Sequence, residues 1–345
     1  MSVLVRAPLA WFGPGRLVAR AAVVADGDRV TFAGQEADAP EASEVIELDG
    51  FLMPAAADRH VHIGLSDPVA VLGRGVTAVR DLGWPADAIF SMSEASQWGT
   101  YAGPLIVASG PILTAPAGYP SQDSWAPEGT ALEIPEPEDA VWAVEELVSR
   151  GAGQIKVALN GEAGPTPSDA VLAAIVATAA EHELPVTVHA QGKGEVERAV
   201  GAGVTELAHT PWSHRLSERA IQAMAGSLRV VSTLDMLSFG NDTPQIRVAL
   251  DNLRRFHDAG GEVVYGTDLG NGAIPPGIHV RELMLMREAG LSNDEIIAGL
   301  IRAPIEEGGP ADLIGLPESP FSDLSVFDDL LLVMRGGEVA WAVGE

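Results

Sequence analysis

Short apolar runs alternate with amphipathic helical stretches through the middle of this chain, and this alternation restricts the fold more than any other feature. Strands separated by helices are typical of βαβ units, whose strands are parallel. Eight such units over about 250 residues predict a (β/α)8 barrel. An open, doubly wound sheet is the main rival, although no glycine-rich dinucleotide-binding motif follows the first run. The expected strands are Phe51–His62, Val76–Asp81, Leu105–Ser109, Gln154–Leu159, Val186–His189, Glu206–His209, Arg229–Thr233 and Val263–Gly266.

Helical periodicity is clear between several of these strands. Apolar residues recur there at the three- and four-residue spacing of an amphipathic helix. The stretch Tyr101–Ile134 is instead rich in Pro, Gly and Ser, and predicts a long loop after the third strand, of a kind that is often functional. The expected helices are Glu138–Ser149, Ser168–His182, Gly194–Ala202, Ser217–Ala225 and Thr243–Ala259.

Both ends of the chain have a different pattern, in which short β runs are joined by tight turns. Asp-Gly between two such runs is a good hairpin signal. We therefore expect residues 1–53 and 311–345 to form one small β-sandwich domain, and residues 54–310 to form the barrel. The short runs are Leu17–Ala25, Arg29–Ala33, Leu324–Phe327, Leu330–Met334 and Glu338–Val343, with turns at Asp26-Gly27 and Gly336-Gly337.

The charge balance and the absence of cysteine restrict the partners of this chain. Its 21 basic and 48 acidic residues give a formal net charge of −27, which would repel nucleic-acid phosphates and anionic membranes. Without cysteine there are no disulfides, and any metal site must use imidazole and oxygen ligands. Residues 1–15 lack a signal-peptide core, and no apolar run is long enough to cross a bilayer. We expect a cytoplasmic protein with a small-molecule substrate and no nucleic-acid or membrane partner; homo-oligomers are left open.

Polar side chains stand at or near the ends of several expected strands. His60 and His62 are two residues apart, so both imidazoles face the same side of a strand. Because strand ends converge at the C-terminal face of a barrel, residues far apart in the sequence can meet there. A lone histidine at such a place is more often a hydrogen-bonded core residue than a ligand, but the other four histidines lie in helices or loops. The joint placement predicts a metal site made of His60, His62, Lys156, His189, His209 and Asp268.

The same residues resemble the amidohydrolase superfamily. The ordered set His-X-His, Lys, His, His, Asp is specific, and its spacing looks most like the branch of imidazolonepropionase-related proteins and prolidase-like dipeptidases. The resemblance implies a distorted (β/α)8 barrel with a small β domain built from both termini. It rests on Asp58-Arg59-His60-Val61-His62, Lys156, Val188-His189-Ala190, His209 and Gly266-Thr267-Asp268.

The resemblance also implies a role for each residue. His60, His62 and Asp268 would hold the more buried metal, and His189 and His209 the second. Lys156 would be carboxylated and bridge both ions, since an ammonium would be repelled by two cations. Two zinc ions are the expected cofactor, although manganese, iron and nickel accept similar ligands. A metal-activated hydroxide would cleave a C–N bond of an amide, cyclic amide, N-acyl amino acid or dipeptide, with Asp268 as general base and then acid.

Other functions remain open. A mononuclear deaminase or imidazolone-type hydrolase would use a single metal and an uncarboxylated Lys156. A lactonase or esterase would use the same hydroxide. A non-catalytic scaffold is less expected, because all six ligands are present.

Substrate-binding candidates follow other strands or lie in the long loop. Arg80 can bind a carboxylate bidentately, but an ion pair with Asp81 or another acid is the favoured interpretation. Tyr119 can donate a hydrogen bond to an oxyanion, or simply pack; it stands where related dipeptidases often have a histidine, which argues against peptidase specificity. The candidates are Arg80, Tyr119, Asn160, Trp212 and His214.

Overall fold

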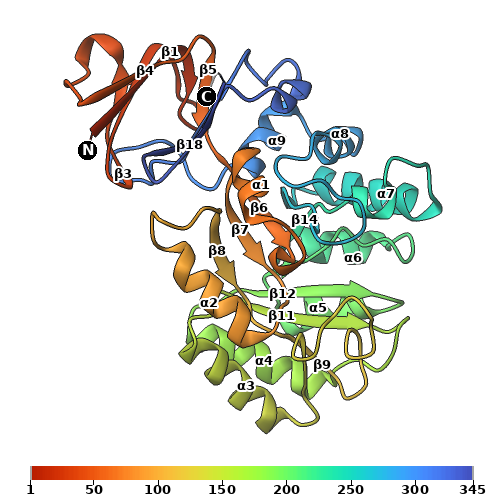
Figure 1. The fold of residues 1–345 in the computed structure, drawn as a ribbon. Coiled ribbons are helices and arrows are strands. Elements are labelled where there is room, and N and C mark those ends of the chain that lie inside the picture. The colour runs from red at the N-terminus through yellow and green to blue at the C-terminus, as the bar shows by residue number, and fades with distance from the viewer. Residues whose placement is uncertain (1, 344–345) are drawn as a thin grey trace.

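Parallel and antiparallel sheets occupy different parts of this α/β protein. The computed structural model describes residues 2–343; residues 1, 344 and 345, at the ends of the expected small-domain ranges, lie outside the described residues. Figure 1 shows the N-terminal strands in red beside the dark blue strand β18, at the opposite end of the molecule from helices α3 and α4. No helix within the described range is long and apolar enough to cross a membrane.

One eight-stranded sheet combines strands from both ends of the chain, in the order β18-β17-β16-β5-β1-β2-β3, with β4 also paired to β1. The expected hairpin is confirmed, because β2 and β3 are antiparallel and Gly27 in the turn has a φ of +56°. The strands are β1 (Ser2–Trp11), β2 (Leu17–Asp26), β3 (Arg29–Gln35), β4 (Glu44–Glu47), β5 (Phe51–Pro54), β16 (Leu313–Leu316), β17 (Leu332–Arg335) and β18 (Glu338–Ala342).

Two predictions for this sheet are wrong. Leu324–Phe327 is not a strand but part of a 3-10 helix, which begins where the Asp323 side chain accepts a hydrogen bond from the Ser325 N–H. Phe51–His62 is not one strand, because Pro54 has no N–H for a ladder and the chain changes sheet there. The β5 part pairs with β1 and β16, whereas the part from Ala56 pairs with β7.

Two parallel sheets follow, one of seven strands (β10-β9-β11-β12-β13-β14-β15) and one of three (β6-β7-β8). All the pairs within them are parallel, as the alternation with helices predicts. The seven remaining expected strands are found within two residues of their predicted starts, and β9 and β10 correct the loop expected at Tyr101–Ile134. The strands are β6 (Ala56–Val61), β7 (Val76–Asp81), β8 (Leu105–Ala108), β9 (Ile112–Thr114), β10 (Ala131–Glu133), β11 (Ile155–Asn160), β12 (Val186–Gln191), β13 (Glu206–Leu207), β14 (Arg229–Val231) and β15 (Glu262–Val264).

Backbone hydrogen bonds link the two parallel sheets at both sides. The N–H of Gly153, just before β11, donates to the carbonyl of Ala108 in β8 at 3.0 Å. The N–H of His62, just after β6, donates to the carbonyl of Leu269 beyond β15 at 2.7 Å. The carboxyl ends of strands from both sheets therefore lie close together.

Helices follow most of the parallel strands. Side chains cap several of them, since Ser168, Ser217 and Thr243 each accept a hydrogen bond from the N–H three residues on. The five expected helices are confirmed, and α1, α2, α8 and α9 are additional. The helices are α1 (Pro68–Gly73), α2 (Ala86–Ser96), α3 (Pro137–Ser149), α4 (Asp169–Glu181), α5 (Glu195–Ala202), α6 (Glu218–Ala225), α7 (Pro244–Asp258), α8 (Val280–Glu288) and α9 (Asn293–Leu300).

Candidate active site

The six residues predicted as metal ligands line one cavity of about 170 Å³. Each lies in a parallel strand or in the short segment that follows one, so the strand order brings them together. All are buried, with exposed fractions between 1% and 7%. They are His60, His62, Lys156, His189, His209 and Asp268.

Among the described residues, His60, His62 and Asp268 form a group whose donor atoms lie close enough to hold one metal ion. The Nε2 atoms of His60 and His62 lie 3.1 Å and 3.4 Å from Oδ1 of Asp268. The Nδ1 atoms lie 2.9 Å from the carbonyl of Ala208 and 3.0 Å from that of Gly83. Because a carbonyl only accepts, each Nδ1 carries a proton. Burial lowers the pKa of His60 well below its ordinary value, so its Nε2 presents a lone pair to the carboxylate. Although burial lowers the pKa of His62 as well, the contact with Asp268 raises it above its ordinary value. Backbone carbonyls orient metal-binding histidines in the same way, so this group fits a divalent cation.

Two buried polar atoms in the cavity have no hydrogen-bond partner, Nζ of Lys156 and Oδ1 of Asp268. Buried polar atoms are normally paired, so both are available to a ligand. Burial lowers the pKa of Lys156 to about 7, and Arg80 also lowers it, while Asp268 and Glu206 act in the opposite direction. A substantial fraction of Lys156 is therefore a neutral amine at neutral pH.

The imidazoles of His189 and His209 lie beside this group. The ring centroids of His60 and His209 are 4.5 Å apart, and those of His189 and His209 are 4.9 Å apart. Nδ1 of His209 lies 2.9 Å from the hydroxyl of Thr233. Burial lowers the pKa of His189 to about 3 and that of His209 well below its ordinary value. Both rings are therefore neutral, which is the form that binds metals.

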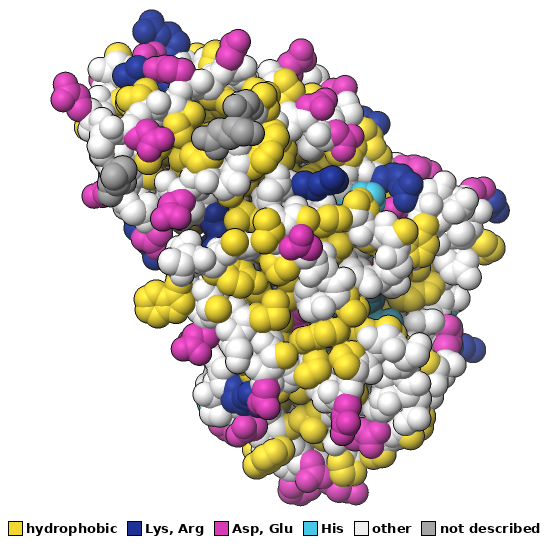
Figure 2. Space-filling model, in the orientation of Figure 1, with side chains coloured by type: hydrophobic (Ala, Val, Ile, Leu, Met, Phe, Trp, Pro, Cys, Tyr) yellow, Lys and Arg dark blue, Asp and Glu magenta, His cyan; other side chains and the backbone are white. Residues whose placement is uncertain are grey.

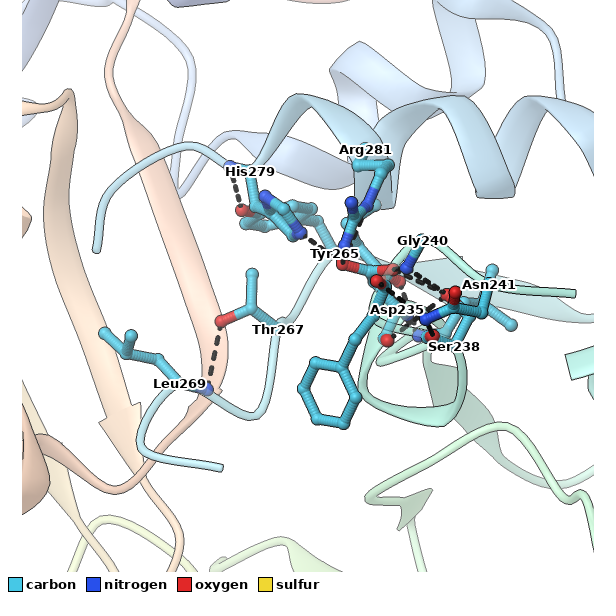
Figure 3. Close-up of polar contacts among 12 residues, drawn as sticks. Asp235, Ser238, Gly240, Asn241, Tyr265, Thr267, Leu269, His279 and Arg281 are labelled. Carbon is cyan, nitrogen blue, oxygen red and sulfur yellow. Dashed lines mark hydrogen bonds and ion pairs between the residues drawn. The ribbon is translucent and has the colours of Figure 1, made fainter. Parts of the chain in front are cut away.

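Asp58 holds the turn that presents Asp268. Its Oδ1 accepts from the N–H groups of His60 and Thr267, and its Oδ2 accepts from the Thr267 hydroxyl at 2.5 Å. Figure 3 shows the same hydroxyl beside the N–H of Leu269, which donates to it at 3.1 Å. Asp268 itself has a φ of +61°, a left-handed conformation that is costly for a residue other than glycine. The Asp58 contacts therefore fix an unfavourable backbone at the centre of the site.

The candidates for substrate binding divide into two groups. Tyr119, Asn160 and Trp212 line the cavity. Arg80 and His214 are not among its lining residues. The Arg80 guanidinium lies 2.5 Å from the carboxylate of Glu206, so Arg80 forms its ion pair with Glu206 and not with the neighbouring Asp81.

Residues 51–300 match the amidohydrolase family, and this range includes all six predicted ligands. The chain belongs to the amidohydrolase family. It is accordingly a hydrolase acting on carbon–nitrogen bonds, in a family that generally uses a divalent metal. The expected resemblance to this superfamily is confirmed.

Two known proteins are similar to this amidohydrolase along nearly the whole chain. Ochratoxinase of Aspergillus niger is 25% identical, over 95% of this chain and 84% of its own length. The ochratoxinase crystal structure has a TM-score of 0.79 at 21% identity, with 99% of this chain and 96% of that chain covered. A Xaa-Pro dipeptidase with bound methionine has a TM-score of 0.83 at 22% identity, with 98% and 99% covered. Their folds are therefore alike.

Six cavity residues of the amidohydrolase were not predicted; two of them, Ile112 and Ala158, are apolar strand residues, and four carry polar, aromatic or sulfur-containing side chains. Gln191 is two residues after His189, so strand periodicity could have found it. Asn271 follows Asp268, and its Nδ2 donates to Oδ2 of Asp268 at 3.0 Å. Trp125 lies in an irregular segment and Met236 in a single-turn 3-10 helix, Asp235–Leu237, and no spacing in the sequence indicates which way either side chain points.

An ion-pair cluster around the buried carboxylate of Asp235, shown in Figure 3, holds the segment Asp235–Leu237. Met236 lies in this segment. Oδ2 of Asp235 accepts from Nε2 of His279 at 2.7 Å and from Nη2 of Arg281 at 2.6 Å. The carboxylate of Glu282 accepts from the backbone N–H of Asp235 at 2.8 Å. We call Asp235, His279 and Arg281 the Asp235 clamp. It fixes one wall of the cavity from helix α8 and the residue before it.

Proposed function

We propose that this amidohydrolase cleaves amide C–N bonds with a pair of divalent metal ions, zinc being the expected metal. His60, His62 and Asp268 would hold one ion, and His189 and His209 the other. The observation that carries the proposal is the convergence of two imidazole Nε2 atoms on one carboxylate oxygen, at 3.1 Å and 3.4 Å. A divalent cation between these three atoms would be bound by all of them.

Lys156 would be carboxylated and shared by both ions. The lone pair of its neutral Nζ would attack carbon dioxide, a N–C bond would form, and the amine proton would pass to water. The pKa of about 7, which burial lowers from the ordinary 10.5, supports this step because only the neutral amine is a nucleophile. Nζ has no hydrogen-bond partner and Lys156 lines the cavity, so the added carboxylate would extend into the cavity.

The bound metals would supply a nucleophilic hydroxide at neutral pH and polarise the scissile carbonyl. Asp268 would accept the proton of the attacking water and later deliver it to the leaving nitrogen, as general base and then acid. Asn271, which donates to the outer oxygen of Asp268 at 3.0 Å, would hold that carboxylate in one orientation during both transfers. Tyr119, Asn160 and Trp212 would contact the substrate.

The names of the relatives support an amide substrate. One is an ochratoxinase and another a dipeptidase for Xaa-Pro peptides. For this chain the proposed substrate class is small amides, including cyclic amides, N-acyl amino acids and dipeptides.

We also propose that the parallel strands form one distorted (β/α)8 barrel, over residues 54–310, with a small β-sandwich domain from residues 1–53 and 311–345. The hydrogen bonds from Gly153 to Ala108 and from His62 to Leu269 support the barrel, because they join the two parallel sheets on both sides. A core that includes Phe12, Leu52 and Met334 supports the sandwich.

Metal analysis tests the function directly. After expression with added zinc, the protein should hold about two equivalents of metal, and a chelator should abolish amide hydrolysis that zinc then restores. About one equivalent would instead indicate the mononuclear deaminase or imidazolone-type alternative. Hydrolysis that continues in chelated, metal-free protein would disprove the proposal.

A further inference from the structure

We infer that the cavity selects amides whose substituents are aromatic or apolar and carry no carboxylate. The inference rests on the proposed hydrolase function and narrows its substrate class. Three features of the cavity support it: its aromatic rings, its uncharged amide side chains, and the lack of a free cation among the described lining residues.

Three aromatic side chains surround the imidazoles. Tyr119 is stacked on the ring of His189, with centroids 5.2 Å apart and planes at 28°. The Trp125 ring lies 4.9 Å from that of His62, and the Trp212 ring lies 5.4 Å from that of His209. All three are partly exposed, so each offers a ring face or edge to a bound molecule. Such rings favour a flat or apolar substituent next to the scissile bond.

No arginine is found among the described residues that line the cavity, and Lys156 is their only lysine. Lys156 belongs to the proposed metal centre, and Arg80 is paired with Glu206. Proteins usually bind a carboxylate through a bidentate guanidinium, and a carboxylate buried without a partner loses its hydration. A substrate carboxylate would therefore have no side-chain counterion here.

Beside the proposed metal ligands, the cavity wall includes the neutral amide side chains of Asn160 and Gln191, and Gln191 contacts the acidic Glu162. Nδ2 of Asn160 donates to Oε1 of Gln191 at 3.1 Å, and Nε2 of Gln191 donates to the exposed Glu162 at 2.8 Å. These amides suit an uncharged amide substrate, which both donates and accepts hydrogen bonds. Glu162 would repel an anion that approached beside Gln191.

The charge of the whole protein also disfavours substrates that carry a carboxylate. The formal net charge is −27, and Figure 2 shows acidic side chains over much of the visible face with fewer basic ones. Such a surface lowers the local concentration of anionic substrates and slows their association. Lys193, two residues after Gln191, is exposed but is not a lining residue.

Matched pairs of amides that differ only in a carboxylate test the inference. The zinc-loaded protein is assayed with N-acyl phenylalanine against N-acyl phenethylamine, and with N-acyl leucine against N-acyl isopentylamine, each as acetyl and benzoyl derivatives. The released amine is measured. We expect kcat/KM to be about tenfold or more higher for the member without the carboxylate, and higher for the aromatic pair than for the aliphatic pair.

Variants identify the groups responsible. Glu162→Gln should reduce the preference about two- to fivefold, whereas Glu181→Gln, at the exposed end of α4, should leave it unchanged. Trp212→Ala should raise KM for the aromatic amide more than for the aliphatic one. Lys193→Ala should not alter the preference, because Lys193 does not line the cavity.

Different outcomes of these assays test the substrate preference and the proposed hydrolase function separately. Equal rates within the pairs, or faster cleavage of the carboxylates, would overturn the inference and leave the hydrolase intact. If the metal-loaded protein cleaved none of these amides, the proposed function would fail and the inference with it.

Discussion

Nε2 of His60 lies 3.1 Å from Oδ1 of Asp268, while the other nitrogen of the same ring contacts the carbonyl of Ala208 at 2.9 Å. The hydrogen bond at Nδ1 thus fixes the orientation of the imidazole, with Nε2 pointing toward the carboxylate. Burial lowers the pKa of His60 well below its ordinary value, so the ring does not supply a positive charge of its own. A bound cation is the simplest way to stabilise this pair of residues.

Asp268→Asn should separate proton transfer from metal binding. The amide can still offer an oxygen to a metal, but it cannot accept and return a proton. We expect kcat for amide hydrolysis to fall about a thousandfold, with metal content measured by elemental analysis close to that of the unaltered protein. Asp242→Asn, at an exposed ion pair, is the control and should retain full activity. An Asp268→Asn protein with most of its activity would rule out this role.

Lys156→Ala should remove the shared ligand and leave a hole where the side chain was. We expect metal content to fall to about one equivalent and hydrolysis to be lost, because four neutral imidazoles and one carboxylate hold a pair of cations poorly. A short carboxylic acid such as acetate should partly restore both, since it can occupy the hole. Lys193→Ala is the matched control. Unchanged metal content in Lys156→Ala would contradict the bridging role.

Asp235→Asn should weaken both the fold and the cavity wall. The carboxylate of Asp235 is buried and pairs with His279 and Arg281, and breaking such a cluster leaves charge without a partner. We expect the free energy of unfolding in urea to drop by about 3 kcal/mol, and KM to rise more than kcat falls because Met236 is no longer fixed. Asp242→Asn, at an exposed ion pair, should leave the free energy of unfolding almost unchanged. A loss no larger than this control would show that the Asp235 clamp contributes little.

Glu282 should make stability depend on pH. Burial raises its pKa from 4.5 to about 7, although hydrogen bonds from neighbouring N–H groups oppose the shift. The folded protein therefore holds this proton more tightly than the unfolded chain does, and the contribution of Glu282 to stability decreases as the pH rises from about 4.5 to about 7.

Glu282→Gln provides the measurement. We compare the free energy of unfolding of this variant with that of the unaltered protein. The variant minus the unaltered protein should increase by up to about 3 kcal/mol between pH 5 and pH 8, because the variant does not lose this contribution to stability. Urea titrations at several pH values give this difference. A difference that stays constant with pH would show that the carboxyl group titrates normally in the folded state.

The sequence predicts those parts of the molecule that depend on periodicity. Strand β11 is buried along its whole length, and β12 nearly so, because parallel strands covered on both faces are apolar throughout. A charged or imidazole side chain in or just after such a strand stands out, which is why Lys156, His189 and His209 could be identified. The alternation of strands and helices then predicts that these ends meet.

Residues whose positions depend on tertiary contacts could not be predicted. Trp125 reaches the cavity from an irregular segment, and Met236 does so because Asp235 is held by residues far along the chain. Arg80 follows the same strand-end pattern as the ligands, but its long side chain reaches Glu206 instead of the cavity. Pattern and spacing carry no information about such long-range pairings.

The order of the strands in the eight-stranded sheet has a consequence for synthesis on the ribosome. Strand β5 pairs with β1 on one side and with β16 on the other, and β16 is translated only after all the parallel strands. While the catalytic segment emerges, one edge of β5 stays open to pairing with other chains. Slow elongation in that interval would favour aggregation, and a chaperone that shields strand edges would benefit this protein most before β16 appears.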